Sequence, residues 1–273
     1  LGWSHTVNNP DLIDVYELDL AKDNPLKYKV DGKWIELEEI PISFKVKLLG
    51  PIKITVNKKG YRSIFGPIFE SVSGKKYAIR FQGMDDVRVI EQWYKMNKAS
   101  NFNEWESAMS MMAIPSFNTG YADKDGNIFY VYNAKFPIRS PGYNWRGVLP
   151  GNTSETLWKG NITFAELPQI KNPNSGLIQN CNSSPFQTTD GNDNPNESQF
   201  PEWLGIETIM TNRALRSLEL FGSDEYISSD DMMNYKYDLK YSEKSNLAKI
   251  IKRTNEITTD NPLLISAIRV LQK

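Results

Sequence analysis

Apolar and polar residues alternate through residues 12–82, and this period limits what that part of the chain can form. Residues 13–20 (IDVYELDL) alternate apolar with charged side chains, as a half-buried strand does. The dipeptide Asp31-Gly32 favours the tight turn of a β-hairpin between the short runs on either side of it. Further runs with the same period lie at residues 42–47, 52–56, 61–68 and 77–81. We therefore expect antiparallel strands throughout this region.

Beyond residue 82 the period changes to that of helices. The first helix is expected at residues 87–96, with one apolar face turned inward. The residues expected on that face are Val87, Ile90, Trp93, Tyr94 and Met96. A second amphipathic helix is expected at residues 102–111, because Asn101 before it is a residue type that caps helix N-termini.

The rest of the chain mixes strands, loops and helices. Strands are predicted to return around the turn Asp125-Gly126, whereas the Pro, Gly, Asn and Ser of residues 137–201 predict long ordered loops. Apolar stripes then predict helix at residues 205–220, and residues 228–273 are expected to be helical as well. The predicted fold class is α+β with mostly antiparallel sheet.

Composition excludes several classes of protein. The 273 residues, 40% of them hydrophobic, suffice for a sizeable core in one or two domains. Thirty-two basic against 33 acidic residues form no basic stripe, so nucleic acid is not an expected partner. No apolar run approaches the ~20 residues of a membrane span. The single histidine, His5, and single cysteine, Cys181, exclude a two-histidine zinc site and an internal disulfide.

Short amides and hydroxyls crowd residues 172–185 (NPNSGLIQNCNSSP). Such groups are costly to bury without hydrogen-bond partners. The segment is therefore either a solvated loop or a polar site built to receive a ligand.

Six segments resemble, in the same order, the second part of the β chain of the penicillin acylase family. They are residues 1–8 (LGWSHTVN), 62–67 (RSIFGP), 117–123 (FNTGYAD), 149–151 (LPG), 172–176 (NPNSG) and 179–182 (QNCN). The family consists of N-terminal-nucleophile amidohydrolases and includes the acyl-homoserine-lactone acylases. The resemblance implies part of an αββα sandwich, with a β-rich inserted subdomain at residues 17–82. Residues 83–273 would hold helices, returning core strands, long loops and C-terminal helices.

The resemblance also implies a chemistry. In the family, a serine that opens the β chain after autocatalytic cleavage attacks the amide, and its own α-amine is the base. An α-amine has a reference pKa of about 8, so it can accept the hydroxyl proton near neutrality. Here the first residue is Leu1. We therefore expect a fragment of a longer polypeptide, with no nucleophile in this chain and no activity when it is isolated.

The residues that remain would stabilise the transition state. By position, the backbone N–H of Val7 and the side-chain amide of Asn182 resemble the family's oxyanion-hole donors, each typically worth about 3–4 kcal/mol of barrier. Arg213 resembles the arginine that orients this asparagine and the amine, and Arg216 is the rival by physics alone. For Val7 simple core packing stays open. His5 is expected to be a strand-end histidine with a backbone partner.

The resemblance further implies a structural calcium ion. The matching carboxylates are Asp11, Asp14 and Glu202, joined by the carbonyls of Ile13 and Trp145, and such oxygens suit calcium. One more carboxylate would come from the α chain, and the alternative is that the two aspartates merely flank a turn. Residues 123–127 (DKDGN) lack the later Glu of a calcium loop, so a hairpin turn is predicted there.

The implied partners are the α chain, the N-terminal part of the β chain and a small acylated amide. The implied location is periplasmic or secreted, in a bacterium. Without its partners, we expect the chain to expose sheet edges and apolar surface and to self-associate. A different class remains open, namely a carbohydrate-binding or adhesion module, because seven Trp and the Asn-rich loops would suit sugars. A third possibility is an inactivated acylase relative.

Overall fold

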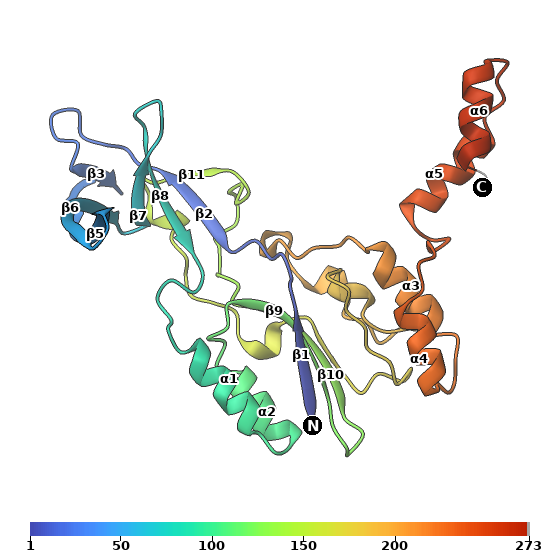
Figure 1. The fold of residues 1–273 in the computed structure, drawn as a ribbon. Coiled ribbons are helices and arrows are strands. Elements are labelled where there is room, and N and C mark those ends of the chain that lie inside the picture. Colours follow the sequence, from blue (N-terminus) through green and yellow to red (C-terminus); the bar gives the residue numbers. More distant parts are fainter. Residues whose placement is uncertain (272–273) are drawn as a thin grey trace.

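The computed structural model describes residues 1–271, which form two antiparallel-rich sheets flanked by helices (Figure 1). The first sheet has four strands in the order β1-β9-β10-β12, and all its neighbours are antiparallel. Its strands are β1 (Gly2–Thr6), β9 (Ser116–Ala122), β10 (Ile128–Ala134) and β12 (Gln169–Lys171). The β9–β10 hairpin confirms the two returning strands predicted from the sequence.

The second sheet has six strands in the order β11-β2-β8-β7-β6-β5. They are β2 (Ile13–Glu17), β5 (Glu38–Leu49), β6 (Ile52–Ser63), β7 (Gly66–Glu70), β8 (Lys76–Phe81) and β11 (Val148–Pro150). Only β11 pairs in parallel, with β2. A separate hairpin joins β3 (Lys27–Val30) to β4 (Lys33–Glu36), and both Asp31 and Gly32 have the positive φ that its turn requires. The predicted hairpin is confirmed.

The strand predicted at residues 61–68 is divided in two. β6 ends at Ser63 and β7 begins at Gly66, which pair across a tight turn. Gly66 has a φ of 137°, and a Cβ there would lie 2.0 Å from the Ile79 carbonyl oxygen. The break follows from this close approach of β8, which an alternating sequence pattern does not record.

Two helices, α1 (Val89–Lys98) and α2 (Phe102–Met109), cover one face of the first sheet (Figure 1). The Phe102 ring meets the edges of Tyr121 and Phe129 at 5.3 Å. The Asn101 side chain accepts a hydrogen bond from the Glu104 backbone N–H at 3.0 Å, so the predicted cap is confirmed. Aromatic packing between α2 and the sheet thus builds the larger of two cores.

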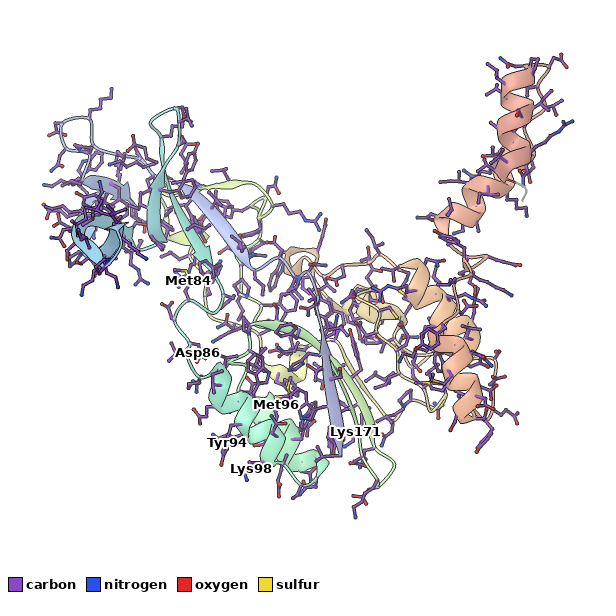
Figure 2. All side chains as sticks on the ribbon, in the orientation of Figure 1. Met84, Asp86, Tyr94, Met96, Lys98 and Lys171 are labelled. Atoms are coloured by element: carbon purple, nitrogen blue, oxygen red, sulfur yellow. The ribbon has the colours of Figure 1, made fainter. Side chains whose placement is uncertain are left out.

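The predicted inner face of α1 is wrong in part. Val87 precedes the helix, and Ile90 and Tyr94 are 67% and 62% exposed. Figure 2 shows Tyr94 directed away from the sheet and Met96 directed toward it. Of the five predicted residues only Trp93 and Met96 pack against the core, and Val89 and Gln92 take the other inward positions.

A polar residue, Gln92, takes the inward position instead. Its Oε1 accepts hydrogen bonds from the backbone N–H groups of Ala113 (2.8 Å) and Ile114 (2.9 Å), and its Nε2 donates to the Met109 carbonyl. Gln92 thereby satisfies the backbone where α2 gives way to β9, which would otherwise be buried without partners. This tertiary requirement outweighs the hydrophobic pattern.

The predicted long loops are ordered. These loops contain short 3-10 helices at Ser154–Thr156, Phe164–Glu166, Pro185–Gln187, Glu197–Gln199 and Glu202–Leu204. The following helix, α3 (Asn212–Phe221), begins later than the predicted residue 205. It starts where the Thr211 hydroxyl accepts a hydrogen bond from the Ala214 N–H at 3.2 Å.

The C-terminal helical stretch consists of three helices, α4 (Ser229–Lys236), α5 (Asn246–Asn255) and α6 (Pro262–Leu271). α5 and α6 extend away from the body of the molecule (Figure 1). Residues 272 and 273, the end of the stretch predicted to be helical, lie outside the described residues. Among the helices described, none is long and apolar enough to cross a bilayer.

Candidate active site

The segment after β1 meets the asparagine-rich loop and the start of α3. Asn182 Nδ2 donates to the Val7 carbonyl oxygen at 2.8 Å, and Arg213 Nη2 donates to Asn182 Oδ1 at 2.9 Å. Arg213 also binds the Cys181 carbonyl at 3.2 Å. Three residues that the sequence singled out are thus brought together from distant parts of the chain.

Arg213 determines which way the Asn182 amide points. A guanidinium only donates, so the group that it binds must be the amide oxygen, and the NH₂ group must face Val7. An NH₂ group has two N–H bonds. One is directed at the Val7 carbonyl, which leaves the other for a ligand oxygen.

The backbone of Asn182 is also constrained. Its φ of 55° lies in the left-handed region, which non-glycine residues visit rarely and asparagine tolerates best. The Asn182 N–H donates to Asn180 Oδ1 at 3.1 Å, which holds this conformation. Such a strained residue in a polar loop is typical of sites that bind or react.

A second set of residues completes the network. Sequence reasoning placed Asn180 beside Asn182 as a structural neighbour but did not assign Asn118 or Tyr130 to the site. Asn118 Nδ2 donates to the Val7 carbonyl at 3.2 Å, and the Tyr130 hydroxyl donates to Asn118 Oδ1 at 2.7 Å. Asn180 Nδ2 donates to the Tyr130 oxygen at 3.3 Å, and its Oδ1 accepts from the Thr6 hydroxyl. The available signal was Asn118 itself, a polar residue inside a buried strand and within the segment 117–123.

His5 lies on the opposite, helix-covered face of the sheet. Its Nδ1 is 2.9 Å from the Thr119 hydroxyl, and its Nε2 accepts from the Trp93 indole N–H at 3.0 Å. The ring stacks on Phe117. Burial lowers the pKa of the imidazole below its usual 6.5, so the ring is neutral near pH 7. Side chains, rather than backbone alone, therefore bind both ring nitrogens.

Comparison with known proteins supports the likeness in sequence. The family model described as Penicillin amidase matches residues 1–272. The chain belongs to the penicillin amidase family. Penicillin G acylase from Escherichia coli is 30% identical over 188 residues, which are 68% of this chain and 22% of that protein. Acyl-homoserine lactone acylase PvdQ from Pseudomonas fluorescens (strain Pf0-1) is 28% identical over 210 residues, 67% of this chain and 27% of that protein.

A solved structure shows the same fold. The thermostable penicillin G acylase from Alcaligenes faecalis matches with a TM-score of 0.76 and 22% identity, over 99% of this chain and 46% of that one. The fold is therefore that of the N-terminal-nucleophile hydrolases, as predicted. This penicillin amidase family chain spans only about a quarter of the length of the curated relatives named above.

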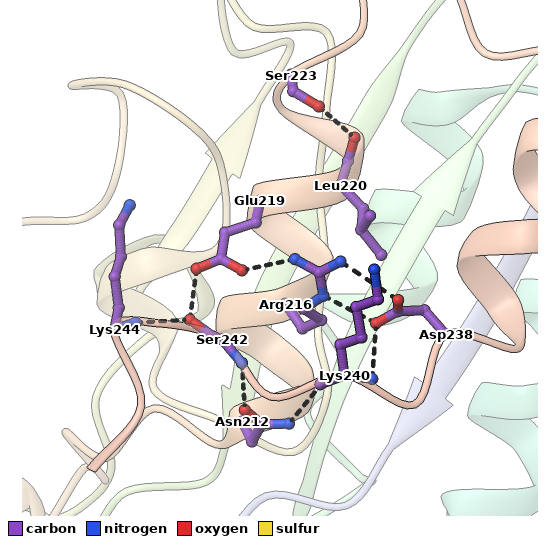
Figure 3. A network of polar contacts seen from close by, with 9 residues as sticks. All are labelled: Asn212, Arg216, Glu219, Leu220, Ser223, Asp238, Lys240, Ser242 and Lys244. Carbon is purple, nitrogen blue, oxygen red and sulfur yellow. Dashed lines mark hydrogen bonds and ion pairs between the residues drawn. The ribbon is translucent and has the colours of Figure 1, made fainter. Parts of the chain in front are cut away.

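Arg216, the rival arginine, is held elsewhere in this member of the penicillin amidase family. Figure 3 shows its guanidinium between Asp238 and Glu219, at 2.8 and 3.0 Å. The Ser242 hydroxyl binds the other oxygen of Glu219. The network ties α3 to residues 238–244, so Arg216 stabilises the packing of that segment on the helix. Of the two arginines, Arg213 alone bonds to Asn182.

Cys181 lies beside the site, but its thiol is half-buried. Burial raises the pKa of this thiol, so the thiolate is scarce near pH 7. Its carbonyl, not its sulfur, takes part in the network, through Thr211 and Arg213.

The predicted calcium donors only partly converge. Asp11, Trp145 and Glu202 line one cavity of about 340 Å³, and Asp11, Ile13 and Trp145 line a neighbouring one of about 370 Å³. Asp14 does not join them. Its two carboxylate oxygens accept from Arg139 at 3.0 and 3.1 Å.

The donor set of this chain does not fit a calcium ion as it stands. The Arg139 guanidinium also lies 3.5 Å from Asp11, so a protein cation occupies the place next to both aspartates. Within residues 1–271, no three Asp, Glu, His or Cys side chains gather as a metal site would require. The calcium ion stays a prediction that depends on groups outside this chain.

The Asp123 segment forms a hairpin turn, as predicted. Asp123 Oδ1 accepts from the backbone N–H groups of Asp125 and Asn127, at 2.9 and 3.0 Å. These bonds are those of a turn between β9 and β10 and use the oxygens that a metal ion would need.

Proposed function

We propose that this chain supplies the oxyanion-stabilising part of an N-terminal-nucleophile amidohydrolase. The whole protein would cleave the amide between an acyl group and an amine-bearing moiety. The observation that carries the proposal is the hydrogen-bond chain from Arg213 through Asn182 to Val7. It orients an amide NH₂ group beside a backbone segment that is 56% exposed at Val7.

The chemistry requires two donors for one developing charge. A serine oxygen attacks the amide carbon while the serine's α-amine takes the hydroxyl proton, and the carbonyl oxygen becomes an oxyanion. The Val7 N–H and the free N–H of Asn182 would bind that oxygen. The intermediate then expels the amine, which takes the proton from the α-ammonium, and water hydrolyses the resulting acyl ester.

Preorganisation is what makes such donors effective. Donors already aimed at the developing charge need not reorganise during the reaction, and each is typically worth about 3–4 kcal/mol. Arg213 and the Val7 carbonyl hold the Asn182 amide from both sides, and Asn118 holds the Val7 carbonyl. A positive charge beside the α-amine would also lower its pKa and keep it a base.

The nucleophile would come from outside these 273 residues. The chain spans only 22% and 27% of two curated relatives, so most of such a protein lies outside it and could supply the serine. We therefore propose the α chain and the N-terminal part of the β chain as partners. The isolated chain should not hydrolyse amides.

The names of the relatives suggest the substrate class. One is a penicillin G acylase and another an acyl-homoserine lactone acylase, so an acylated β-lactam nucleus or homoserine lactone is the proposed substrate. Both are bacterial proteins, in line with a periplasmic or secreted location. A carbohydrate-binding module has less support, because Trp34 alone of the seven Trp is more than half exposed.

The test uses the full-length protein and the 273-residue chain side by side. Each is assayed with an acyl-homoserine lactone and a chromogenic phenylacetyl amide. The full-length protein should turn over one of them, and Asn182→Ala should lower kcat by about 10²–10³. Asn172→Ala is the matched control, since Asn172 also has a positive φ and lies in the same loop.

Two outcomes of this assay would contradict the proposed function. No turnover by the full-length protein would indicate an inactivated relative. Turnover by the isolated chain that Asn182→Ala abolishes would show that the nucleophile lies within it, against the proposal.

A further inference from the structure

The Tyr130 hydroxyl lies between two asparagines. Tyr130 projects from β10 and is 1% exposed. It donates to Asn118 Oδ1 at 2.7 Å and accepts from Asn180 Nδ2 at 3.3 Å. A hydroxyl is among the few side-chain groups that can satisfy an amide oxygen and an amide nitrogen at once.

Each of the two asparagines reaches a different half of the candidate oxyanion site. Asn118 Nδ2 donates to the carbonyl of Val7, at the end of β1. Asn180 Oδ1 accepts from the backbone N–H of Asn182, on the asparagine-rich loop. Tyr130 therefore adds a buried link between the two halves, beside the direct bonds of Asn182 to Val7 and of Thr6 to Asn180.

The hydroxyl completes the hydrogen bonds of both amides. The Val7 carbonyl only accepts, so the nitrogen of Asn118 must face it and the oxygen of Asn118 faces Tyr130. The Asn182 N–H only donates, so the oxygen of Asn180 must face it and the nitrogen of Asn180 faces Tyr130. Without the hydroxyl each amide would lose the partner that holds its other end.

We propose that Tyr130 is a positioning residue that couples the two oxyanion donors, Val7 and Asn182. The proposal rests on the function proposed above. Tyr130 touches neither substrate nor nucleophile in this role and acts only through Asn118 and Asn180.

The coupling should not depend on pH. Burial raises the pKa of the Tyr130 phenol well above its usual value, so the group keeps its proton and remains a donor. A change at Tyr130 should therefore alter the height of a pH–rate profile and leave its shape unchanged.

The experiment compares two tyrosines of one sheet in the full-length protein. Tyr130→Phe removes the coupling hydroxyl. Tyr121→Phe is the matched control, because Tyr121 on β9 is equally buried but its hydroxyl donates to Asp123 in the hairpin turn. Tyr130→Phe should lower kcat about 10- to 100-fold, with KM within about two-fold and the pH profile unchanged in shape. Tyr121→Phe should stay close to the wild-type protein.

Hydrogen exchange gives a readout that does not need turnover. In Tyr130→Phe, residues 3–8 and residues 178–184 should both exchange faster, whereas Tyr121→Phe should leave both unchanged. A double variant tests the route, since Tyr130→Phe should cost little more once Asn118→Ala is present.

Three results would overturn the inference. Equal kcat for Tyr130→Phe and Tyr121→Phe, faster exchange in only one of the two segments, or fully additive losses with Asn118→Ala would each do so. A wild-type full-length protein that hydrolyses no acyl amide would instead overturn the proposed function, and the role of Tyr130 with it.

Discussion

Arg213 Nη2 donates to Asn182 Oδ1 at 2.9 Å, across 31 residues of sequence. This one bond joins α3 to the asparagine-rich loop and determines that the amide nitrogen of Asn182 faces Val7. A cation with fixed geometry thus orients a neutral donor, as the oxyanion role proposed for Asn182 would require.

Substitutions of the two arginines of α3 should affect different properties, the turnover number for Arg213 and the thermal stability for Arg216. In the full-length protein, Arg213→Met should lower kcat about 10- to 100-fold with little change in melting temperature, because the Asn182 amide becomes free to turn. Arg216→Met should lower the melting temperature by a few degrees and spare kcat, because it breaks the network with Asp238 and Glu219. Steady-state kinetics and thermal unfolding measure both, and exchanged phenotypes would refute the assignment.

Arg139 should be one of the most sensitive positions for stability. Its buried guanidinium binds Asp14 twice and the Trp203 carbonyl at 2.8 Å. Arg139→Met leaves a buried, unpaired carboxylate and should cost about 3–5 kcal/mol in denaturant unfolding.

Two variants check the cause of that loss. The double variant Arg139→Met/Asp14→Leu should recover much of the stability, since no charge is then left buried. Arg62→Met removes an exposed pair with Asp85 and should cost less than about 1 kcal/mol. Equal losses for Arg139→Met and Arg62→Met would be inconsistent with a buried ion pair.

His5 should titrate below its usual pKa. As the single histidine, it gives one imidazole signal in NMR, and a titration should place its pKa under 6.5. Since the folded-state pKa lies below the unfolded one, His5 stabilises the fold fully above pH 6.5 and loses this contribution as pH falls through the folded pKa. Trp93→Phe removes the donor to Nε2 and should raise the pKa, whereas Trp34→Phe, at an exposed site, should not.

Calcium should not stabilise the isolated chain. Asp14 is held by Arg139, so the remaining oxygens do not complete a site of six to eight ligands. Thermal unfolding in the presence of excess calcium and of a chelator should give the same midpoint. A calcium-dependent rise that Asp11→Asn abolishes would show that this chain binds the ion unaided.

The isolated chain should self-associate. The long β5–β6 hairpin exposes Ile42, Phe44 and Ile54, and α5 and α6 expose further apolar residues. Light scattering should show oligomers, and Phe44→Lys together with Ile54→Lys should reduce them, because charge on a strand opposes edge pairing. A wild-type monomer with a cooperative melt would contradict this prediction.

Local features were predicted well because they depend on neighbours along the chain. The Asp31-Gly32 turn needs two residues of positive φ, and the Asn101 cap needs one side chain and one N–H three residues away. Both requirements can be recognised from a few consecutive residues. The inner face of α1 was mispredicted because Gln92 is buried to accept hydrogen bonds from the backbone N–H groups of Ala113 and Ile114. These two residues lie about 20 positions further along the chain.

The sequence by itself determined the alternating strands, the hairpin turns and the family, and through the family it indicated Val7, Asn182 and Arg213. Tertiary structure alone decided that Asn118, Tyr130 and Asn180 link them. These three residues come from β9, β10 and the asparagine-rich loop, and their hydrogen bonds close only when strand register and loop path bring donors and acceptors within 3.3 Å. Directional bonds of such short range are set by packing of the whole fold, which no local pattern encodes.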